Sequence, residues 1–106
     1  MDKIRDEFVI DNLKEFKRKI SLKYNIDKII LFGSRARGDN LENSDVDVIV
    51  VSSDFNGSIR HRSSEILEYW DTYPDLEVIC YTPEEFKRKK KEIGLVQTAV
   101  KQGIVI

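Results

Sequence analysis

The sequence predicts an α/β fold, a small mixed β-sheet packed with helices, and three observations support this class. The 106 residues leave room for one domain, residues 1–106, of ordinary size. Hydrophobic residues make up 41 % and charged residues 35 % of the chain, which is the composition of a globular protein. Short β-branched runs alternate with stretches whose apolar residues recur at helical spacing. This alternation is typical of a sheet covered by helices.

The elements follow from these periodicities and from local helix signals. Thr82, Pro83 and Glu85 form a capping pattern that starts a helix, and Gly103 ends the last helix before a terminal Ile-Val-Ile. The predicted elements are a helix over 2–24 that Asn25 ends, a strand over 26–32, a polar connection over 34–44, a strand over 45–51, a helix over 58–72, a strand over 75–82, a helix over 83–92 and a helix to about Gln102. The apolar positions of the first helix are Ile4, Phe8, Leu13, Phe16, Ile20 and Tyr24.

The lengths of the connections predict the strand directions. Only eleven residues separate Gly33 from Asp45, which is barely enough for a parallel crossover, so we expect the first two strands to be antiparallel. More than twenty residues, including a helix, separate the second strand from the third. We therefore expect these two to be parallel, with a right-handed crossover, in a sandwich of two or three layers.

Charge, cysteine content and hydropathy exclude several classes of protein. The formal net charge is −1, so the chain has no broad basic surface of the kind that dedicated nucleic-acid-binding proteins present. The single cysteine, Cys80, has no partner for an internal disulfide and fits a reducing compartment. No apolar run approaches the ~20 residues of a membrane helix, and the N-terminal MDKIRDEF is unlike a signal peptide. We expect a cytoplasmic protein without membrane contact.

Two carboxylates stand at the head of the second predicted strand. Asp45 and Asp47 lie at i and i+2 and point to one face, whereas the valines between and after them point to the other. Like charges this close cannot both stay ionised without a raised pKa or a cation between them. The alternative is that both carboxylates are simply solvated at the start of the strand, or that Asp45 forms a local cap.

A third acid comes from the third predicted strand. Glu77 and Asp75 share a face, and either can project toward the aspartate pair if the two strands are neighbours. Converging carboxylates suit Mg²⁺, which prefers oxygen ligands and usually binds substrate phosphates as well. Two such ions would activate an attacking hydroxyl and neutralise charge on phosphorus oxygens.

Gly33 and Ser34 lie where the first strand passes into a short predicted helix. Such a junction presents free backbone N–H groups to an anion, glycine permits close approach, and serine adds a hydroxyl donor. An ordinary turn explains the pair equally well when it is taken alone, and the spacing is not that of a Walker loop. Together, the phosphate cradle and the carboxylates predict phosphoryl or nucleotidyl transfer.

The segments GSRARGDNLENSDVDVIVV and EVICYTPEEF resemble the minimal nucleotidyltransferases of the DNA polymerase beta superfamily. The resemblance implies a palm-like nucleotidyltransferase fold in which Gly33 and Ser34 hold a nucleoside triphosphate and Asp45 and Asp47 bind the metal. It implies that Arg37 contacts phosphate or a partner, with a solvent-facing structural role as the alternative. Many relatives have aspartate where this chain has Glu77, so the third metal ligand or base is Glu77 or, alternatively, Asp75.

The same resemblance implies a function. Minimal members typically pair with small helical proteins of the HEPN type in toxin–antitoxin systems, and 106 residues leave no room for the helical domain of larger members. We expect a Mg²⁺-dependent enzyme, with two ions and ATP as donor, that transfers AMP to a hydroxyl of such a partner and so acts as an antitoxin. The alternatives are a binding module that neutralises its partner by occlusion, and transfer to a small molecule such as an aminoglycoside, in which a homo-oligomer supplies the second wall.

Other conspicuous residues have structural explanations. We expect a solvated basic face, with contact to nucleic acid or an acidic partner as the alternative, over residues 87–91. We expect His61 at the surface and Cys80 in the core. We expect Tyr69, Trp70 and Tyr73 to pack a helix against the sheet, with contact to a partner as the alternative.

Overall fold

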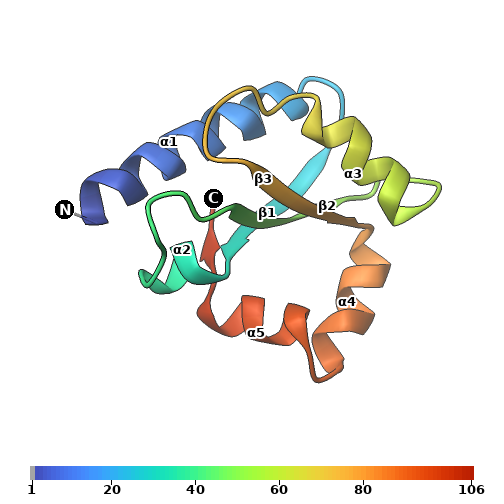
Figure 1. Cartoon of the computed structure of the whole chain (residues 1–106). Helices are drawn as coiled ribbons and strands as arrows, with labels where there is room; N and C mark the ends of the chain where they lie inside the picture. Colours follow the sequence, from blue (N-terminus) through green and yellow to red (C-terminus); the bar gives the residue numbers. More distant parts are fainter. Residues whose placement is uncertain (1) are drawn as a thin grey trace.

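The chain forms a four-stranded sheet flanked by helices on both faces (Figure 1). A computed structural model describes residues 2–106, with side chains from Glu7 onward. Its elements are α1 (Asp2–Ile20), β1 (Ile26–Phe32), α2 (Ser34–Arg37), β2 (Val46–Ser52), α3 (Ile59–Leu67), β3 (Leu76–Tyr81), α4 (Pro83–Lys91), α5 (Leu95–Gln102) and β4 (Ile104–Val105). No helix in this part of the chain is both long and apolar enough to cross a membrane.

The sheet has the order β3-β2-β1-β4, and the predicted strand directions are confirmed. Strand β1 is antiparallel to β2, and β2 is parallel to β3, to which it is joined through α3. The terminal Ile-Val-Ile contains an additional, unexpected strand. This strand, β4, pairs antiparallel with Ile30 and Leu31 of β1. Two residues are too few to produce a periodic signal in the sequence.

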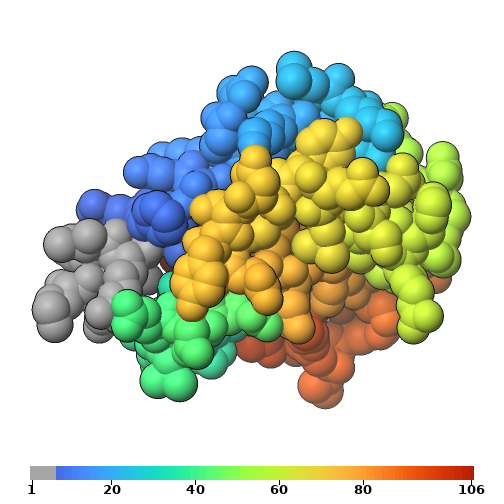
Figure 2. All heavy atoms as spheres, turned by 45° about the horizontal axis from the view of Figure 1, so that its top comes forward, coloured from blue at the N-terminus to red at the C-terminus, as the bar shows by residue number. Residues whose placement is uncertain are grey.

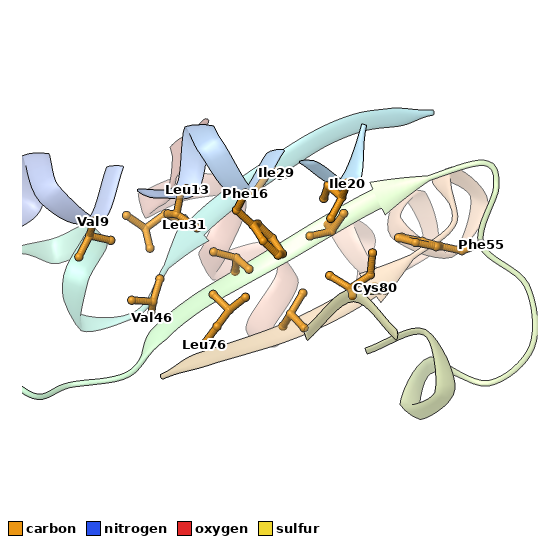
Figure 3. Close-up of a cluster of buried hydrophobic side chains, with 14 residues drawn as sticks. Val9, Leu13, Phe16, Ile20, Ile29, Leu31, Val46, Phe55, Leu76 and Cys80 are labelled. Carbon is orange, nitrogen blue, oxygen red and sulfur yellow. The ribbon is translucent and has the colours of Figure 1, made fainter. Parts of the chain in front are cut away.

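Each face of the sheet has its own core, so the fold has three layers. Helices α1 and α3 cover one face, where the fully buried side chains include Leu13 and Phe16 of α1 and Ile66 of α3 (Figure 3). Helices α4 and α5 cover the other face through Phe86, Val96 and other buried side chains. Alternation along each strand assigns successive residues to the two cores.

The first helix ends earlier than expected. Helix α1 stops at Ile20, and the chain continues as turns in which Tyr24 N–H donates to Ile20 O at 2.8 Å. Phe8 is exposed and Val9 is buried in its place, so the apolar face is shifted by one residue at this point. The side chain of Ile4 lies outside the described residues.

Helix α3 also ends early, at Leu67 instead of residue 72. The following N–H groups bond three residues back, and the Trp70 indole donates to Pro74 O at 2.8 Å, which turns the chain toward β3. Trp70 packs edge-to-face on Phe16 with ring centroids 5.6 Å apart. Tyr73, in contrast, is 61 % exposed, so the expectation that it packs on the sheet was wrong.

The predicted capping box at α4 is confirmed and has an additional partner. Thr82 Oγ1 accepts from Glu85 N–H at 3.2 Å, and Glu85 Oε1 accepts from Thr82 N–H at 2.8 Å. The buried Arg62 of α3 donates to the same carboxylate at 2.6 Å, and this hydrogen bond lowers the pKa of Glu85. The cap therefore joins α3 to α4.

The expectations for Cys80, His61 and the basic residues 87–91 are confirmed. Cys80 is completely buried, which raises the pKa of its thiol to about 12 and leaves it a core residue. His61 is exposed and contacts Glu65 at 2.9 Å within α3. The basic residues 87–91 form the exposed last turns of α4.

Candidate functional site

Two of the predicted acids meet at the centre of the candidate site. Asp47 of β2 and Glu77 of β3 are direct neighbours in the parallel register and lie on the face that α5 covers. Both line a cavity of about 490 Å³ whose walls also include Phe32 and Leu95. The register of β2 and β3 therefore makes Asp47 and Glu77 neighbours, which the sequence left open.

The surroundings of Asp47 disfavour its ionised form. Partial burial, a side-chain hydrogen bond to Glu77 and the negative charges of Glu77 and Asp45 raise the pKa of Asp47 to about 6, while the charge of Arg37 acts in the opposite direction. An acid that is costly to ionise near neutral pH binds a cation or a proton readily. This is the property expected of a metal-binding or proton-accepting carboxylate.

Gly33 lies directly against Asp47. It joins β1 to α2 with φ of 77°, and a Cβ added here would overlap Asp47 Oδ2. A side chain at this position would therefore be strained by its backbone and would displace the carboxylate. Ser34 is half-buried beside it and begins α2.

The loop between α2 and β2 is held by Arg35, a residue that no sequence pattern identifies. Arg35 is 4 % exposed and donates three hydrogen bonds, at 2.8 and 3.0 Å to Ser44 O and at 3.0 Å to Glu42 O. These bonds fix the chain directly before Asp45 and so connect the glycine segment to the carboxylates. Nothing in the sequence separates Arg35 from the exposed Arg37 two residues later.

Arg37 lies on the rim of the site. It is exposed, contacts Asp39 at 3.2 Å and lines a second cavity of about 280 Å³ together with Gly33. Phe32 and Leu95 line both cavities, so the two adjoin. Arg37 therefore places a positive charge on the open surface beside the carboxylates.

The two remaining candidates lie at the ends of strands. Asp45 directly precedes β2 and is exposed, and Asp75 directly precedes β3 and is also exposed. Asp75 O accepts from Val46 N–H at 2.8 Å, which anchors the start of the parallel pair. Figure 2 shows the green loop that follows α2 beside the gold segment that leads into β3. The register of β2 and β3 pairs Asp47 with Glu77, and not with Asp75.

The donor set fits a hard divalent cation. Asp47 and Glu77 offer adjacent carboxylate oxygens, and Asp45 is near enough for its charge to raise the pKa of Asp47. Carboxylate oxygens are the ligands that Mg²⁺ prefers. Within the part of the chain that the structure describes, no group of three or more His, Cys, Asp or Glu side chains is arranged as a ready metal site. The two-ion site stays a prediction.

Comparisons with known proteins identify the family of the chain. The family model described as "Nucleotidyltransferase domain" matches residues 13–102. "Putative protein adenylyltransferase MJ0141" of Methanocaldococcus jannaschii is 56 % identical over 45 residues, which are 41 % of this chain and 46 % of that protein. "Putative protein adenylyltransferase MJ1379" of the same organism is 35 % identical over 70 residues, or 66 % of this chain and 70 % of that protein. The chain thus spans about half the length of the first of these relatives.

A solved structure supports the fold. The crystal structure described as "a putative nucleotidyltransferase from Sulfolobus solfataricus" superposes with a TM-score of 0.67 at 21 % identity, covering 99 % of this chain and 86 % of that one. At this identity the likeness concerns the fold alone. The family model, in contrast, covers most of the chain, including Gly33, Asp47 and Glu77. The chain belongs to the nucleotidyltransferase domain family.

Proposed function

We propose that this protein is a nucleotidyltransferase that transfers AMP from ATP to a hydroxyl group of a partner protein, with Mg²⁺ as cofactor. The observation that carries the proposal is the pairing of Asp47 with Glu77 directly against Gly33. Carboxylates beside a glycine bend bring metal-binding oxygens next to a backbone that a phosphate can approach. The names of the relatives, "putative protein adenylyltransferase", support a protein as acceptor.

The metal would be held by Asp45, Asp47 and Glu77. Bound Mg²⁺ would neutralise charge on the phosphate oxygens and make the acceptor hydroxyl a stronger nucleophile. Gly33 gives the triphosphate access to the backbone, and Ser34 adds a hydroxyl donor at the start of α2. Arg37, at the rim, supplies positive charge for phosphate or for the partner.

The reaction is a displacement at the α-phosphorus. The acceptor oxygen forms a bond to this phosphorus, the bond between the phosphorus and the oxygen leading to the β-phosphate breaks, and pyrophosphate leaves. The hydroxyl proton passes to a carboxylate, for which Glu77 is placed at the exposed side of the pair. Positioning and electrostatics supply most of the catalysis in such transfers.

The identity of the partner comes from the family resemblance. A small helical protein of the HEPN type would carry the acceptor hydroxyl, and its modification would make this chain the antitoxin. Occlusion without transfer and transfer to a small molecule such as an aminoglycoside are the competing functions.

Labelling with ATP that carries ³²P at the α-position tests the proposal. The chain is incubated with Mg²⁺ and the candidate partner, and label on the partner protein is expected. Asp47→Asn should abolish the label, whereas Asp27→Asn, an exposed acid of β1, should retain it. Inhibition of the partner without label would instead identify an occluding module, and label only on an added small acceptor would identify a small-molecule transferase.

A further inference from the structure

We propose that the free edge of β3 binds the acceptor as an extended polypeptide segment, which adds to the sheet as a fifth strand and presents its hydroxyl to the carboxylates. This inference rests on the proposed transfer to a protein hydroxyl and names how the acceptor is recognised. Addition of a strand to a sheet edge is a general mode of peptide binding.

The backbone of β3 has hydrogen-bonding groups that face away from the sheet. Strand β3 is the outermost strand next to β2. The bond from Val46 N–H to Asp75 O fixes the alternation of the parallel pair. Residues 75, 77 and 79 therefore bond to β2, and the N–H and C=O groups of Leu76 and Val78 point outward.

Within the described part of the chain, the outward hydrogen-bonding groups of this edge are occupied at both ends of β3 and unoccupied between them. Pro74 O accepts from the Trp70 indole at 2.8 Å, and Cys80 O accepts from Arg62 at 3.3 Å. Among the described residues, no hydrogen bond joins the backbone of residues 76–79 to a segment other than β2. A partner strand can therefore pair over this short stretch and no further.

A cavity runs along the open stretch and leads to the carboxylates. Residues 76–79 line the same cavity of about 490 Å³ as Asp47, and its flanks are Leu67 of α3 and Leu95 of α5. Both leucines are partly exposed, at 39 % and 48 %. Apolar walls on either side of an unpaired edge suit the alternating side chains of an extended peptide.

The register places a hydroxyl correctly. Neighbouring strands lie about 4.8 Å apart, and side chains on one face of a sheet stand beside each other. A Ser, Thr or Tyr of the added strand that lies beside Glu77 would share its face, which is also that of Asp47. The edge thus delivers the acceptor oxygen to the α5 side of the sheet, where Gly33 and the paired carboxylates would hold the ATP.

Ribonuclease A in two conformations is a suitable probe. Its reduced, carbamidomethylated chain offers extended segments with many hydroxyls, whereas its native form offers the same sequence in a folded state. With α-labelled ATP and Mg²⁺, we expect label on the unfolded form at least about tenfold faster than on the native form, since one or two lost hydrogen bonds correspond to about this factor.

Substitutions at Val78 separate the backbone from the side chain. Val78→Pro removes an outward N–H that β2 does not use, and Val78→Ala removes the valine side chain while keeping the N–H. The proline variant should lose about tenfold in labelling of the unfolded chain relative to the alanine variant. If Val78→Pro does not fold, Leu67→Ser provides the test and should reduce labelling of the unfolded chain. The control is Leu22→Ser, because Leu22 lies in the turn after α1 and is 81 % exposed.

The outcomes separate this inference from the proposed function. Binding of ATP with Mg²⁺, followed as a rise in melting temperature, should be the same in Val78→Pro and Val78→Ala. Equal labelling of both ribonuclease forms, equal labelling by the two variants, or no label while ATP still stabilises the protein would overturn edge recognition. Absence of any nucleotide effect on the unsubstituted chain would overturn the proposed function itself.

Discussion

Asp47 couples the chemistry of the site to the stability of the fold. Its pKa, about 6, lies above the ordinary value of 3.8, chiefly because the carboxylate is partly buried. The folded state therefore binds the proton more tightly than the unfolded state, and the free energy of unfolding falls as pH rises from about 4 to about 6. Above this range the ionised carboxylate destabilises the metal-free protein.

The first prediction follows from the loss of stability that ionisation of Asp47 causes. In the absence of Mg²⁺, Asp47→Asn should raise the free energy of unfolding at pH 7 by about 1 kcal/mol, a value reduced for solvent screening of a partly exposed group. At pH 4 the gain should disappear. Urea denaturation at the two pH values measures both quantities, with Asp27→Asn as the matched substitution. A loss of stability at pH 7, or a gain independent of pH, would contradict the cause assigned to the pKa.

Gly33 gives a second prediction at the scale of one residue. Gly33→Ala should lower the free energy of unfolding by about 2 to 3 kcal/mol, because it adds backbone strain and overlap with Asp47. Gly57→Ala is the control, since Gly57 has φ of 73° but its nearest neighbour, His61 Cδ2, would lie 3.8 Å from the added Cβ. Chemical denaturation and ATP binding measure the two variants. Equal losses of stability, with ATP binding retained in both, would show that the approach to Asp47 is unimportant.

At the scale of elements, the strands were predicted better than the helix ends. The run IDKIILF is bounded by a polar turn and by Gly33, and the observed β1 has the predicted bounds. Helices α1 and α3 end earlier than predicted, because turns with hydrogen bonds three or four residues back replace regular helix while the apolar spacing continues. Periodicity records which side chains face the core and is insensitive to such changes in the backbone.

The candidate site was predictable in part, because the sequence pattern shows on which face of a strand each side chain lies. Alternation along strands placed Asp47 and Glu77 on defined faces, but only the parallel register decided that they are neighbours. The contribution of Arg35 could not be predicted, because a buried arginine that bonds backbone carbonyls looks in sequence like any surface arginine. Such contacts depend on how a loop folds back, which leaves no periodic signal.

Arg35 provides the prediction that belongs to this scale. Arg35→Met keeps most of the apolar stem but removes three hydrogen bonds, so the free energy of unfolding should fall by about 2 to 4 kcal/mol. Amides of residues 39–45 should exchange with solvent faster, because Ser44 and Glu42 lose their anchor. Arg35→Lys keeps a positive charge but replaces the guanidinium with one ammonium group. Its free energy of unfolding should lie between those of the unsubstituted chain and Arg35→Met. Unchanged exchange in this loop would show that Arg35 does not hold it.

At the scale of the whole molecule, the site draws on elements that lie far apart in the sequence. Gly33 follows β1, and Leu95 comes from α5. Asp47 comes from the central strand β2, and Glu77 comes from the edge strand β3. Local unfolding of any one of these elements would dismantle the cavity. A ligand that binds there should therefore stabilise the entire fold.

This coupling gives the last prediction. ATP with Mg²⁺, at about 100 times its Kd, should add about 2.7 kcal/mol to the free energy of unfolding, because it binds only the folded chain. For a domain of this size the melting temperature should rise by roughly 10 °C or more. Scanning calorimetry with Mg²⁺ and with EDTA measures the metal dependence. Asp47→Asn should lose most of the shift and Asp27→Asn should keep it, whereas an equal shift with EDTA would show that the carboxylates bind no metal with the nucleotide.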